Sequence, residues 1–454
     1  MNIVLAVVPL YGVDMPPLGA AYIAAVLEKE GYGINVFCFN SELYNQARDK
    51  RFLWGWEASG AWCSPEGINR HFNVNDLLDK WSEKILKCAP KIVGLSVNSH
   101  SRVLANLLAD RLKNKKKDLY VIFGGPWCTE LAEPSEFNKN VDIYVRGEGE
   151  GVIPKIAKLI AGSESIRDCS IEGTIVNTGV GFKDNRANAS FVDINKLPFP
   201  ALHFFDLNYY TNKTEIPILF SRGCNYSCKF CTDKPMWGNY RTRNAENIIE
   251  EMIKHSSIFN RTCFKSNDLL INGDLKQLRY LSEIIINEKL SFTWGGMARA
   301  RSDMSGQLCA VLRKGGCSYL TYGIESGAAR ILFHMGKPGK RDIVQALKNS
   351  YKSGIKVNTL WMAGYPIEKW VDVLETMLFL LRSRRYIHEF VAVSACYIPR
   401  RSRLWQERDK LRIEYDKNSD WHIGKSNTVS IRQLRRKILF SFARILGIYK
   451  GGVQ

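Results

Sequence analysis

The sequence lacks the segments that would place the chain in or across a membrane. It contains no apolar run of about 18 residues, the length that a membrane-spanning helix needs. Its first residues, MNIVLAVVPL, have no basic stretch ahead of the apolar one and so do not resemble a signal peptide. We therefore expect a cytoplasmic protein, in which thiols stay reduced.

A fourth metal-binding side chain is missing from the single cysteine cluster. Of 12 cysteines, only Cys224, Cys228 and Cys231 lie close together, in SRGCNYSCKFC with the spacing CxxxCxxC. The others are expected to be small buried side chains. Structural zinc sites take four protein ligands, which argues against zinc. Three thiolates suit a 4Fe-4S cluster that leaves one iron open to a substrate or cofactor.

The sequence has fewer acidic than basic side chains. Lys and Arg number 64 against 45 Asp and Glu, which gives a net charge of +19. This excess favours an anionic partner, such as a phosphate-bearing small molecule, a nucleic acid or an anionic membrane surface. Nucleic acid is the less favoured of these. The composition, 45% hydrophobic and 24% charged, is that of a globular protein and excludes extended disorder.

Strands alternate with helices over the first 165 residues. This alternation predicts a parallel, doubly wound sheet of the flavodoxin-like (Rossmann-type) class. Residues 41–75 form a polar, aromatic insertion that either covers a ligand as a lid or packs on the domain. The predicted strands are 2–8, 34–40, 91–97, 119–125 and 142–147, and the helices include 18–32, 76–88, 102–115 and 151–162.

Small and polar residues follow the predicted strand ends of this first domain. In open parallel sheets, ligands bind beyond the carboxyl ends of the strands. Glycine at such ends lets the backbone approach a bulky ligand closely, although glycine and proline also make ordinary turns. The candidate ligand-binding residues are Pro17, Gly19, Ser96, Asn98, Gly124, Gly125, Gly147, Glu148 and Gly149.

A second series of strands and helices follows a connecting segment. Residues 166–212 are predicted to form a small hairpin and a proline-broken linker. About six βα units then run from 213 to 400, which predicts a partial (β/α)6 barrel of the TIM type with its active site at the C-terminal strand ends. The unusual residues at those ends are Cys224, Asn267, Asp268, Arg299, Glu325 and Gly364.

The motif CNYSCKFC, with an aromatic residue before its last cysteine, resembles the signature of the radical S-adenosylmethionine enzymes. NDLLINGD, GIESG and MAGYPIE resemble further parts of that family's domain. PPLGAAYIAAVLEKEGY, IVGLSVNS, FGGPW and YVRGEGEGVIP resemble the cobalamin-binding domain that precedes it in one large subgroup. The resemblance implies a cobalamin-binding domain over 1–165 and a radical S-adenosylmethionine barrel over 213–400.

The resemblance also implies three cofactors: a 4Fe-4S cluster, S-adenosylmethionine and cobalamin. Cys224, Cys228 and Cys231 would ligate the cluster. For two of the residues that would contact S-adenosylmethionine, a structural role is the alternative: Asp268 could be a strand-end cap and Glu325 could form an ion pair. The residues that would contact S-adenosylmethionine are Asn267, Asp268, Arg299, Glu325, Ser326 and Gly364. Many cobalamin proteins supply a histidine to the cobalt from a DxHxxG motif, but the loop YGVDMPPLG has no histidine. The resemblance therefore implies cobalamin bound without that lower ligand. His100 is a less favoured replacement.

The activity that the resemblance favours is methylation of an unactivated carbon in a small or anionic substrate. An external electron donor of the flavodoxin or ferredoxin type would be needed. Cyclisation or rearrangement without net methylation is the first alternative, and a non-catalytic, metal-stabilised nucleic-acid-binding protein is the second. GYPIEK and PRRSRLW depart from the family's pattern near the substrate region, so the substrate class stays open. The oligomeric state stays open as well.

The C-terminal residues 401–454 are expected to form a small, basic helical region. Within it, 430–446 is predicted as an amphipathic helix whose apolar stripe is Leu434, Ile438, Phe442 and Ile445. The favoured role is to pack against the barrel and close it. Weak association with an anionic membrane surface is the alternative.

Overall fold

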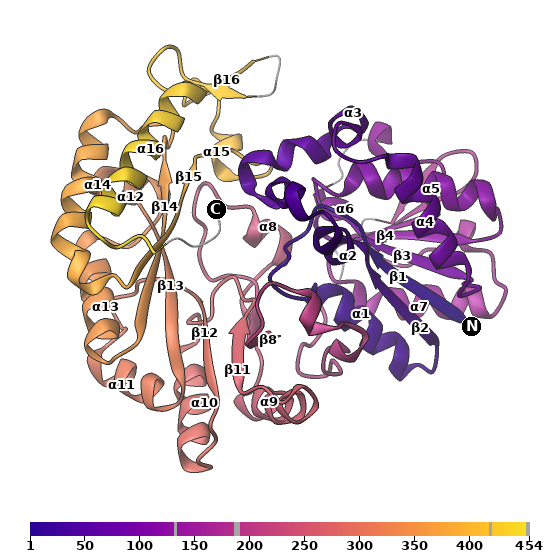
Figure 1. Ribbon diagram of the computed structural model, residues 1–454, viewed down its shortest axis with the longest axis horizontal. Helices are drawn as coiled ribbons and strands as arrows, with labels where there is room; N and C mark the ends of the chain where they lie inside the picture. Colours follow the sequence, from indigo (N-terminus) through magenta and orange to yellow (C-terminus); the bar gives the residue numbers. More distant parts are fainter. Residues whose placement is uncertain (131–133, 186–190, 417–419, 451–454) are drawn as a thin grey trace. The chain divides into compact units, whose positions relative to one another are not determined.

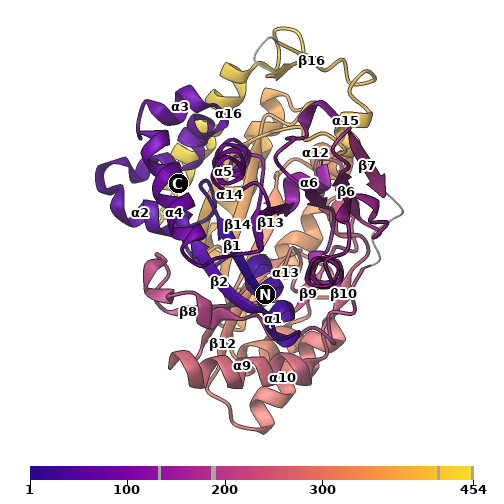
Figure 2. The same cartoon turned by 90° about the vertical axis from the view of Figure 1, so that its right-hand side faces the viewer.

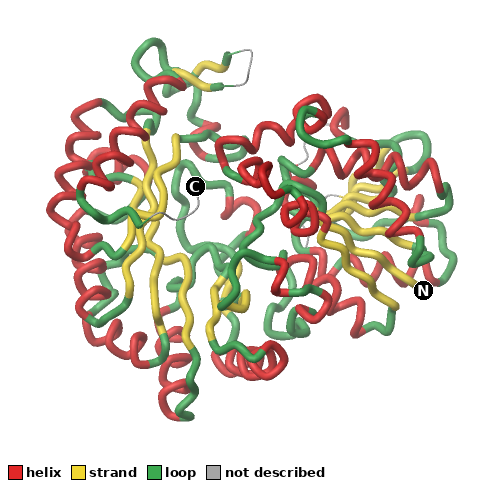
Figure 3. The backbone as a smooth tube through the Cα atoms, in the orientation of Figure 1, coloured by secondary structure: helices red, strands yellow, loops and turns green. Residues whose placement is uncertain are grey.

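The computed structural model describes residues 1–130, 134–185, 191–416 and 420–450 (Figure 1). The chain divides into two compact units, Met1–Lys213 and Thr214–Gln454. Each unit has helices packed around a sheet (Figure 3), so the predicted α/β class is confirmed. In the described part of the chain, no helix combines the length and the apolar character needed to cross a bilayer.

The first unit is built on a seven-stranded sheet with the order β2-β1-β3-β4-β5-β6-β7. The first five strands in sequence pair in parallel, as the strand and helix alternation predicts. These are β1 (Asn2–Val7), β2 (Gly33–Cys38), β3 (Ile92–Ser96), β4 (Tyr120–Gly124) and β5 (Ile143–Val145).

The two faces of this sheet carry separate hydrophobic cores. Successive side chains of a strand point to opposite faces, so Ile3 and Leu5 enter one core and Val4 and Ala6 the other. The first core is covered by α1 (Leu18–Lys29) and α7 (Ile153–Ala161), and the second by α4 (Val74–Leu86) and α5 (Arg102–Lys115). Burial on both faces explains why these strands are continuously apolar.

The hairpin in the predicted connecting segment belongs to this sheet. Strands β6 (Thr174–Asn177) and β7 (Phe182–Asn185) pair with each other, and β6 also pairs antiparallel with β5. The sequence predicts a hairpin and a linker between the domains over residues 166–212, but the hairpin is part of the sheet of the first unit. The antiparallel pairing depends on contacts between distant segments, which the local pattern does not contain.

The insertion over residues 41–75 packs on the second core of the first unit. It folds into α2 (Phe39–Gln46), two 3-10 helices, η1 (Arg48–Trp54) and η2 (Trp56–Cys63), and α3 (Pro65–Asn69). Leu43, Leu53, Trp62 and Ile68 are buried in that core. The packing alternative is therefore the one that the structure supports. Because α2 begins at Phe39, strand β2 is also shorter than predicted.

The second unit holds a six-stranded parallel sheet with the order β15-β14-β13-β12-β11-β8. Its strands follow one another in space in the same order as in sequence, as in the predicted partial barrel. They are β8 (Glu215–Ile218), β11 (Cys263–Ser266), β12 (Thr293–Ala298), β13 (Cys317–Glu325), β14 (Lys356–Ala363) and β15 (Glu389–Ala395).

Helices cover the outside of this sheet, and α9 and α10 pack side by side (Figure 2). The C-terminal helix α16 (Val429–Ile445) packs against β14 and β15 and is part of the second unit. The predicted packing of this helix on the barrel is thus observed. The connecting helices are α9 (Ala245–Phe259), α10 (Leu275–Asn287), α11 (Gly306–Lys314), α12 (Ala329–Met335), α13 (Lys340–Lys352) and α14 (Trp370–Ser383).

Candidate active site

The three clustered cysteines lie on a loop that follows the first strand of the barrel sheet. The loop begins after β9 (Ser221–Arg222), a short strand paired with β10 (Arg241–Thr242). Gly223 starts it with φ of +78°, and a Cβ atom there would lie 2.4 Å from the Asn239 carbonyl oxygen. Glycine is therefore required at the turn that leads into Cys224.

Backbone amides of this loop point at the cysteine sulfurs. The Tyr226 N–H donates to Cys224 Sγ at 3.5 Å, and the Asp233 N–H donates to Cys231 Sγ at 3.4 Å. A bond from the Cys231 N–H to the Cys228 carbonyl, at 3.1 Å, closes the turn between those two cysteines. Hydrogen bonds to sulfur are among the features with which proteins tune iron–sulfur clusters.

The three cysteine side chains of this loop are half-buried. Burial raises the pKa of the Cys224 and Cys231 thiols, and the Asp233 carboxylate adds to this effect at Cys231. A bound metal overrides such shifts because it deprotonates its thiol ligands.

Arg299 lies beside the cysteine loop. It follows β12, and its Nη1 is 3.4 Å from Cys228 Sγ. Its guanidinium stacks over the Tyr226 ring at 3.8 Å, and its Nη2 donates to the Gly336 carbonyl oxygen at 2.7 Å. The backbone of Arg299 is fixed by two hydrogen bonds with the Asn272 side chain. A fixed positive charge therefore lies next to the predicted cluster.

Asp268 is a strand-end cap in this structure. It is buried, and its carboxylate accepts hydrogen bonds from Phe220 N at 2.8 Å, Ser221 Oγ at 2.5 Å and Ser266 Oγ at 2.7 Å. These bonds tie the end of β11 to the segment that leads into the cysteines. The neighbouring Asn267 has an exposed side chain. Of this predicted pair, Asn267 is thus the one available to a ligand.

Glu325 forms an ion pair at the end of β13. Its Oε1 lies 3.1 Å from Lys337 Nζ, and both side chains are largely buried. Lys337 also lies over the ring of Phe230, 5.5 Å from its centroid, so the pair is next to the cysteine motif. Ser326 is buried, with its Oγ 3.3 Å from Thr376 Oγ1 and in position to accept from Ala328 N. The geometry gives Ser326 a local structural role.

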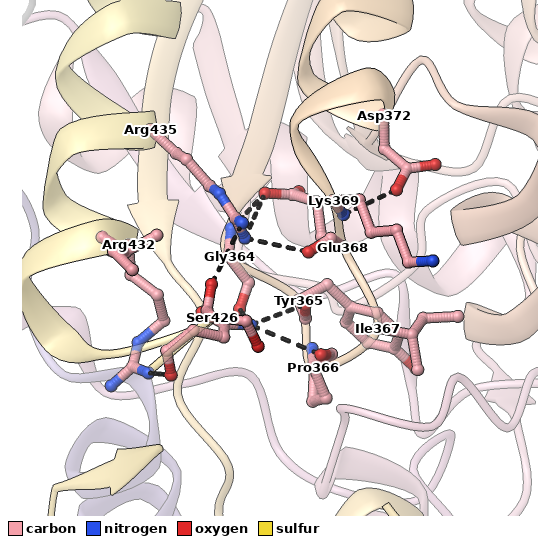
Figure 4. Close-up of polar contacts among 12 residues, drawn as sticks. Gly364, Tyr365, Pro366, Ile367, Glu368, Lys369, Asp372, Ser426, Arg432 and Arg435 are labelled. Carbon is pink, nitrogen blue, oxygen red and sulfur yellow. Dashed lines mark hydrogen bonds and ion pairs between the residues drawn. The ribbon is translucent and has the colours of Figure 1, made fainter. Parts of the chain in front are cut away.

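The turn Gly364–Glu368 is held by the C-terminal segment (Figure 4). Gly364 has φ of +76°, and a Cβ atom there would meet Arg432 Cγ at 2.2 Å. The Gly364 N–H donates to Glu368 Oε1 at 2.9 Å, and Arg435 Nη1 lies 3.4 Å from the same oxygen. The Arg432 side chain therefore occupies the space beside the Cα of Gly364. The contact of the backbone around Gly364 with S-adenosylmethionine stays a prediction.

Arg432 and Arg435 are almost fully buried although they lie on a basic helix. Their exposed fractions are 4% and 2%. Arg432 stacks over the Trp421 ring at 3.8 Å, and Arg435 donates to the Glu368 carbonyl oxygen at 3.0 Å. Buried guanidinium groups need such partners. The buried face of α16 is therefore made of arginines together with Leu439 and Ala443, and the sequence pattern did not reveal it.

A second C-terminal contact reaches the cysteine loop directly. Lys229, within CNYSCKFC, pairs with Glu407 at 2.6 Å, and its carbonyl oxygen accepts from Leu404 N at 2.9 Å. The charge of Lys229 holds the pKa of the Glu407 carboxyl below its usual range. Glu407 was not singled out from the sequence, because no local motif links it to the cysteines 176 positions or more away.

The residues predicted to bind cobalamin lie at the carboxyl edge of the first sheet. Ser96 Oγ is 2.8 Å from the Tyr11 hydroxyl. Asn98 is used within its own loop, since its Nδ2 donates to Leu10 O and its Oδ1 accepts from His100 N and Ser101 N, each at 2.9 Å. Asn98 thus fixes the loop after β3 to the segment after β1, and Tyr11, which contacts Ser96, is a residue that the sequence reasoning missed.

The glycines at this edge differ in the space beside them. A Cβ atom on Gly125, which has φ of +99°, would lie 2.7 Å from the Val97 carbonyl oxygen. At Gly19 and Gly124 no atom lies within 4 Å of the Cβ position, so those two backbones border open space. Open backbone at the strand ends fits a bulky ligand such as cobalamin.

The remaining predicted residues lie just before α1 and on the loop after β5. Pro17 immediately precedes α1 and is half-buried. Gly147, with φ of +69°, donates its N–H to Thr129 Oγ1 at 3.0 Å. Glu148 is buried and accepts from Val192 N at 2.8 Å, and a Cβ atom on Gly149 would touch Ile23 Cδ1 at 3.0 Å. The latter two positions serve the packing of this loop.

His100 is half-buried in the loop after β3. Its ring lies against Trp56 with centroids 6.3 Å apart, and its Nδ1 is 3.4 Å from Ser99 Oγ. Burial lowers the pKa of this imidazole, which favours its neutral form. The side chain has local partners, in line with the favoured interpretation of a loop histidine.

Two family models match the chain. The model of the radical SAM superfamily covers residues 218–380, and that of the B12 binding domain covers residues 4–157. The B12-binding match lies within the first unit and the radical SAM match within the second, in the order that the sequence motifs indicated.

Some of the relatives found by sequence are named methyltransferases, and others are named cyclases. An uncharacterized methyltransferase of Pyrococcus horikoshii is 22% identical over 82% of this chain and 75% of its own length. Cytidylyl-2-hydroxyethylphosphonate methyltransferase of Streptomyces wedmorensis is 23% identical over 79% and 71%. Anaerobic magnesium-protoporphyrin IX monomethyl ester cyclase of Synechocystis is 24% identical over 66% and 61%.

Solved structures share the fold along most of the chain. The radical S-adenosylmethionine methyltransferase TsrM of Kitasatospora setae, with cobalamin and a [4Fe-4S] cluster bound, has a TM-score of 0.64 and 15% identity over 87% of this chain and 71% of that one. OxsB, with aqua-cobalamin and S-adenosylmethionine bound, has a TM-score of 0.65 and 16% identity over 98% and 61%. With its B12-binding domain, its cysteine motif and this fold, the chain belongs to the radical S-adenosylmethionine enzymes that carry a cobalamin-binding domain.

Proposed function

We propose that this chain is a cobalamin-dependent radical S-adenosylmethionine methyltransferase that acts on an unactivated carbon of a small molecule. The observation that carries the proposal is the cysteine loop. Two of its sulfurs accept backbone N–H bonds and the third lies beside Arg299, in a chain that also has a B12-binding domain. Relatives named as methyltransferases favour methylation over other radical reactions.

The residues present suit the cofactors. Cys224, Cys228 and Cys231 would hold a 4Fe-4S cluster, and the carboxyl edge of the first sheet, with open backbone at Gly19 and Gly124, would hold cobalamin. When bound, the cluster supplies the electron that cleaves S-adenosylmethionine to a 5′-deoxyadenosyl radical, and cobalamin supplies the methyl group.

The protein's own contribution is to fix and shield the reacting groups. Arg299 would attract the carboxylate of S-adenosylmethionine, since its guanidinium is already oriented by Tyr226 and the Gly336 carbonyl. The exposed amide of Asn267 would reach the polar part of the same molecule. The Glu325–Lys337 pair would instead position Phe230, the aromatic residue of the cysteine motif.

The net charge of +19 supports an anionic substrate and an acidic electron donor. We propose that the substrate is a small molecule with a phosphate or carboxylate group. The donor would be a protein of the flavodoxin or ferredoxin type, because such proteins are negatively charged and transfer single electrons.

The test is an anaerobic assay of both products of S-adenosylmethionine. The protein is reconstituted with iron, sulfide and cobalamin and then given S-adenosylmethionine, a strong reductant and a cell extract of small molecules. Methylation predicts that 5′-deoxyadenosine and S-adenosylhomocysteine rise together, and only when extract and cobalamin are both present. S-adenosylhomocysteine would come from the second S-adenosylmethionine, which restores the methyl group on cobalt.

A reaction without net methylation is the second candidate. The cyclase of Synechocystis, 24% identical over 66% of this chain, is the observation that favours it. In that case 5′-deoxyadenosine rises alone with the same extract. Formation of neither product by a protein that carries its full cluster would contradict both candidates.

A further inference from the structure

Helix α14 exposes a continuous apolar stripe on the surface of the second unit. The helix also buries apolar side chains on its opposite side, among them Val373, Phe379 and Leu380. A surface helix normally keeps its outward face polar. The stripe consists of Trp370, Val371, Leu374, Leu378 and Leu381, with exposed fractions of 45%, 59%, 58%, 50% and 45%.

The neighbouring helix α16 also exposes apolar side chains. The two helices pack side by side (Figure 1), and the Arg435 guanidinium lies over the Trp370 ring at 5.1 Å. On α16, Leu434 and Ile445 are exposed by 49% and 81%. We call the α14 stripe together with Leu434 and Ile445 the α14/α16 face.

The charge on α14 and α16 that is not compensated by an ion pair is positive. Exposed basic side chains lie at the end of α14 and along α16, namely Arg382, Arg384, Arg385, Lys437 and Arg444. No aspartate or glutamate occurs between Val429 and Lys450. On α14, Asp372 is buried against Arg330 and Glu375 pairs with Lys340, so both carboxylates are already compensated.

We propose that the α14/α16 face binds the surface of an anionic phospholipid bilayer. Helices that lie on membranes combine an apolar face containing Trp and Leu with flanking Lys and Arg, and the basic groups contact the lipid phosphates. A second copy of the chain fits less well, because a twofold contact would bring the same arginines together. This surface is independent of the cofactor sites and of the reaction catalysed.

Flotation of the full chain with lipid vesicles tests the proposal. One set of vesicles contains phosphatidylglycerol and phosphatidylcholine in equal amounts, and the other contains phosphatidylcholine alone. We expect flotation with the anionic set only, weakened by added salt because the charge attraction is screened. The double variant Leu374→Ser/Leu378→Ser should bind about 10-fold more weakly, since it removes two side chains that would enter the interface.

A matched control is Ile253→Ser on α9, which removes an exposed apolar side chain, 46% exposed, away from this face. It should bind vesicles as the unmodified chain does. Iron–sulfur absorption of every reconstituted variant checks that the second unit is folded. Three outcomes overturn the proposal: no flotation with anionic vesicles, equal binding by the double variant, or light scattering that reports a dimer which the double variant dissociates.

Discussion

At the scale of single residues, Arg299 places a positive charge beside the predicted cluster. Its Nη1 lies 3.4 Å from Cys228 Sγ, and the stacking on Tyr226 keeps it there. A positive charge next to an iron–sulfur cluster stabilises the reduced, more negative form and so raises the reduction potential. We therefore expect Arg299 to affect the reduction potential of the cluster in addition to the binding of S-adenosylmethionine.

We predict that Arg299→Leu lowers the reduction potential of the reconstituted cluster by on the order of 60 mV, about a tenfold change in the one-electron equilibrium. A redox titration followed by electron paramagnetic resonance measures it. Arg279→Leu, at an exposed arginine of α10 that pairs with Glu283, should leave the potential unchanged. An unaltered potential in Arg299→Leu with an intact cluster would show that this charge does not act on it.

A second residue-scale prediction concerns Glu368. Burial raises the pKa of its carboxyl from 4.5 to about 7, although the Gly364 N–H and Arg435 counteract this. Between those pH values the folded protein holds a proton that the unfolded chain has released. The group's contribution to stability is therefore present below pH 4.5 and is lost as pH rises through 7, by up to about 3 kcal/mol.

Glu368→Gln cannot titrate, so its free energy of unfolding should fall less than that of the unmodified chain between pH 5 and 8. Denaturant unfolding at a series of pH values measures the difference. Glu283→Gln, at an exposed carboxylate, is the control and should keep the unmodified slope. Identical slopes for all three proteins would mean that Glu368 titrates normally.

At the scale of elements, α16 is a structural part of the barrel unit. It covers β14 and β15, and its Arg432 and Arg435 fix the turn Gly364–Glu368 that follows β14. Asn427, just before the helix, donates from Nδ2 to the carbonyl oxygens of Gly364 and Tyr365. The C-terminal segment thus holds this turn in place through both backbone and side-chain contacts.

Gly364→Ala should destabilise the second unit by about 3 kcal/mol. The new Cβ would both clash with Arg432 and occupy a backbone conformation with φ of +76°, and each effect costs on the order of 1–3 kcal/mol. Denaturant unfolding measures the change. Gly306→Ala, at the start of α11 with nothing within 4 Å of its Cβ position, should be neutral or slightly stabilising. Equal stability of the two variants would contradict the described packing.

At the scale of the whole molecule, the two cofactor sites are assigned to separate units. The residues predicted for cobalamin fall within Met1–Lys213, and the cluster cysteines fall within Thr214–Gln454. Each site is built on its own sheet with its own hydrophobic core. Loss of one cofactor should therefore leave binding of the other intact.

Cys228→Ala should lose the iron–sulfur absorption and all cleavage of S-adenosylmethionine while it binds cobalamin within about twofold of the unmodified chain. Cys263→Ala, at a half-buried cysteine on β11, should keep the cluster. Gly124→Val, which fills open space at the carboxyl edge of β4, should weaken cobalamin binding about tenfold and keep the cluster. Loss of both cofactors in either site variant would contradict the separation.

The sequence by itself determined the features that depend on local spacing. The period of apolar residues predicted both α/β units, and CxxxCxxC without a fourth ligand predicted a cluster with an open iron. These signals lie within a few tens of residues, so no knowledge of distant contacts is needed to interpret them.

Only the tertiary structure decided which residues meet across long stretches of chain. The addition of β6 and β7 to the first sheet, the cap formed by Asp268, and the buried arginines of α16 against Gly364 all join segments that no local pattern connects. On α16, Arg432 and Arg435 are buried whereas Leu434 and Ile445 of the predicted apolar stripe are exposed. Burying a guanidinium group costs free energy unless hydrogen-bond acceptors or opposite charges surround it, and only the folded chain brings such groups together.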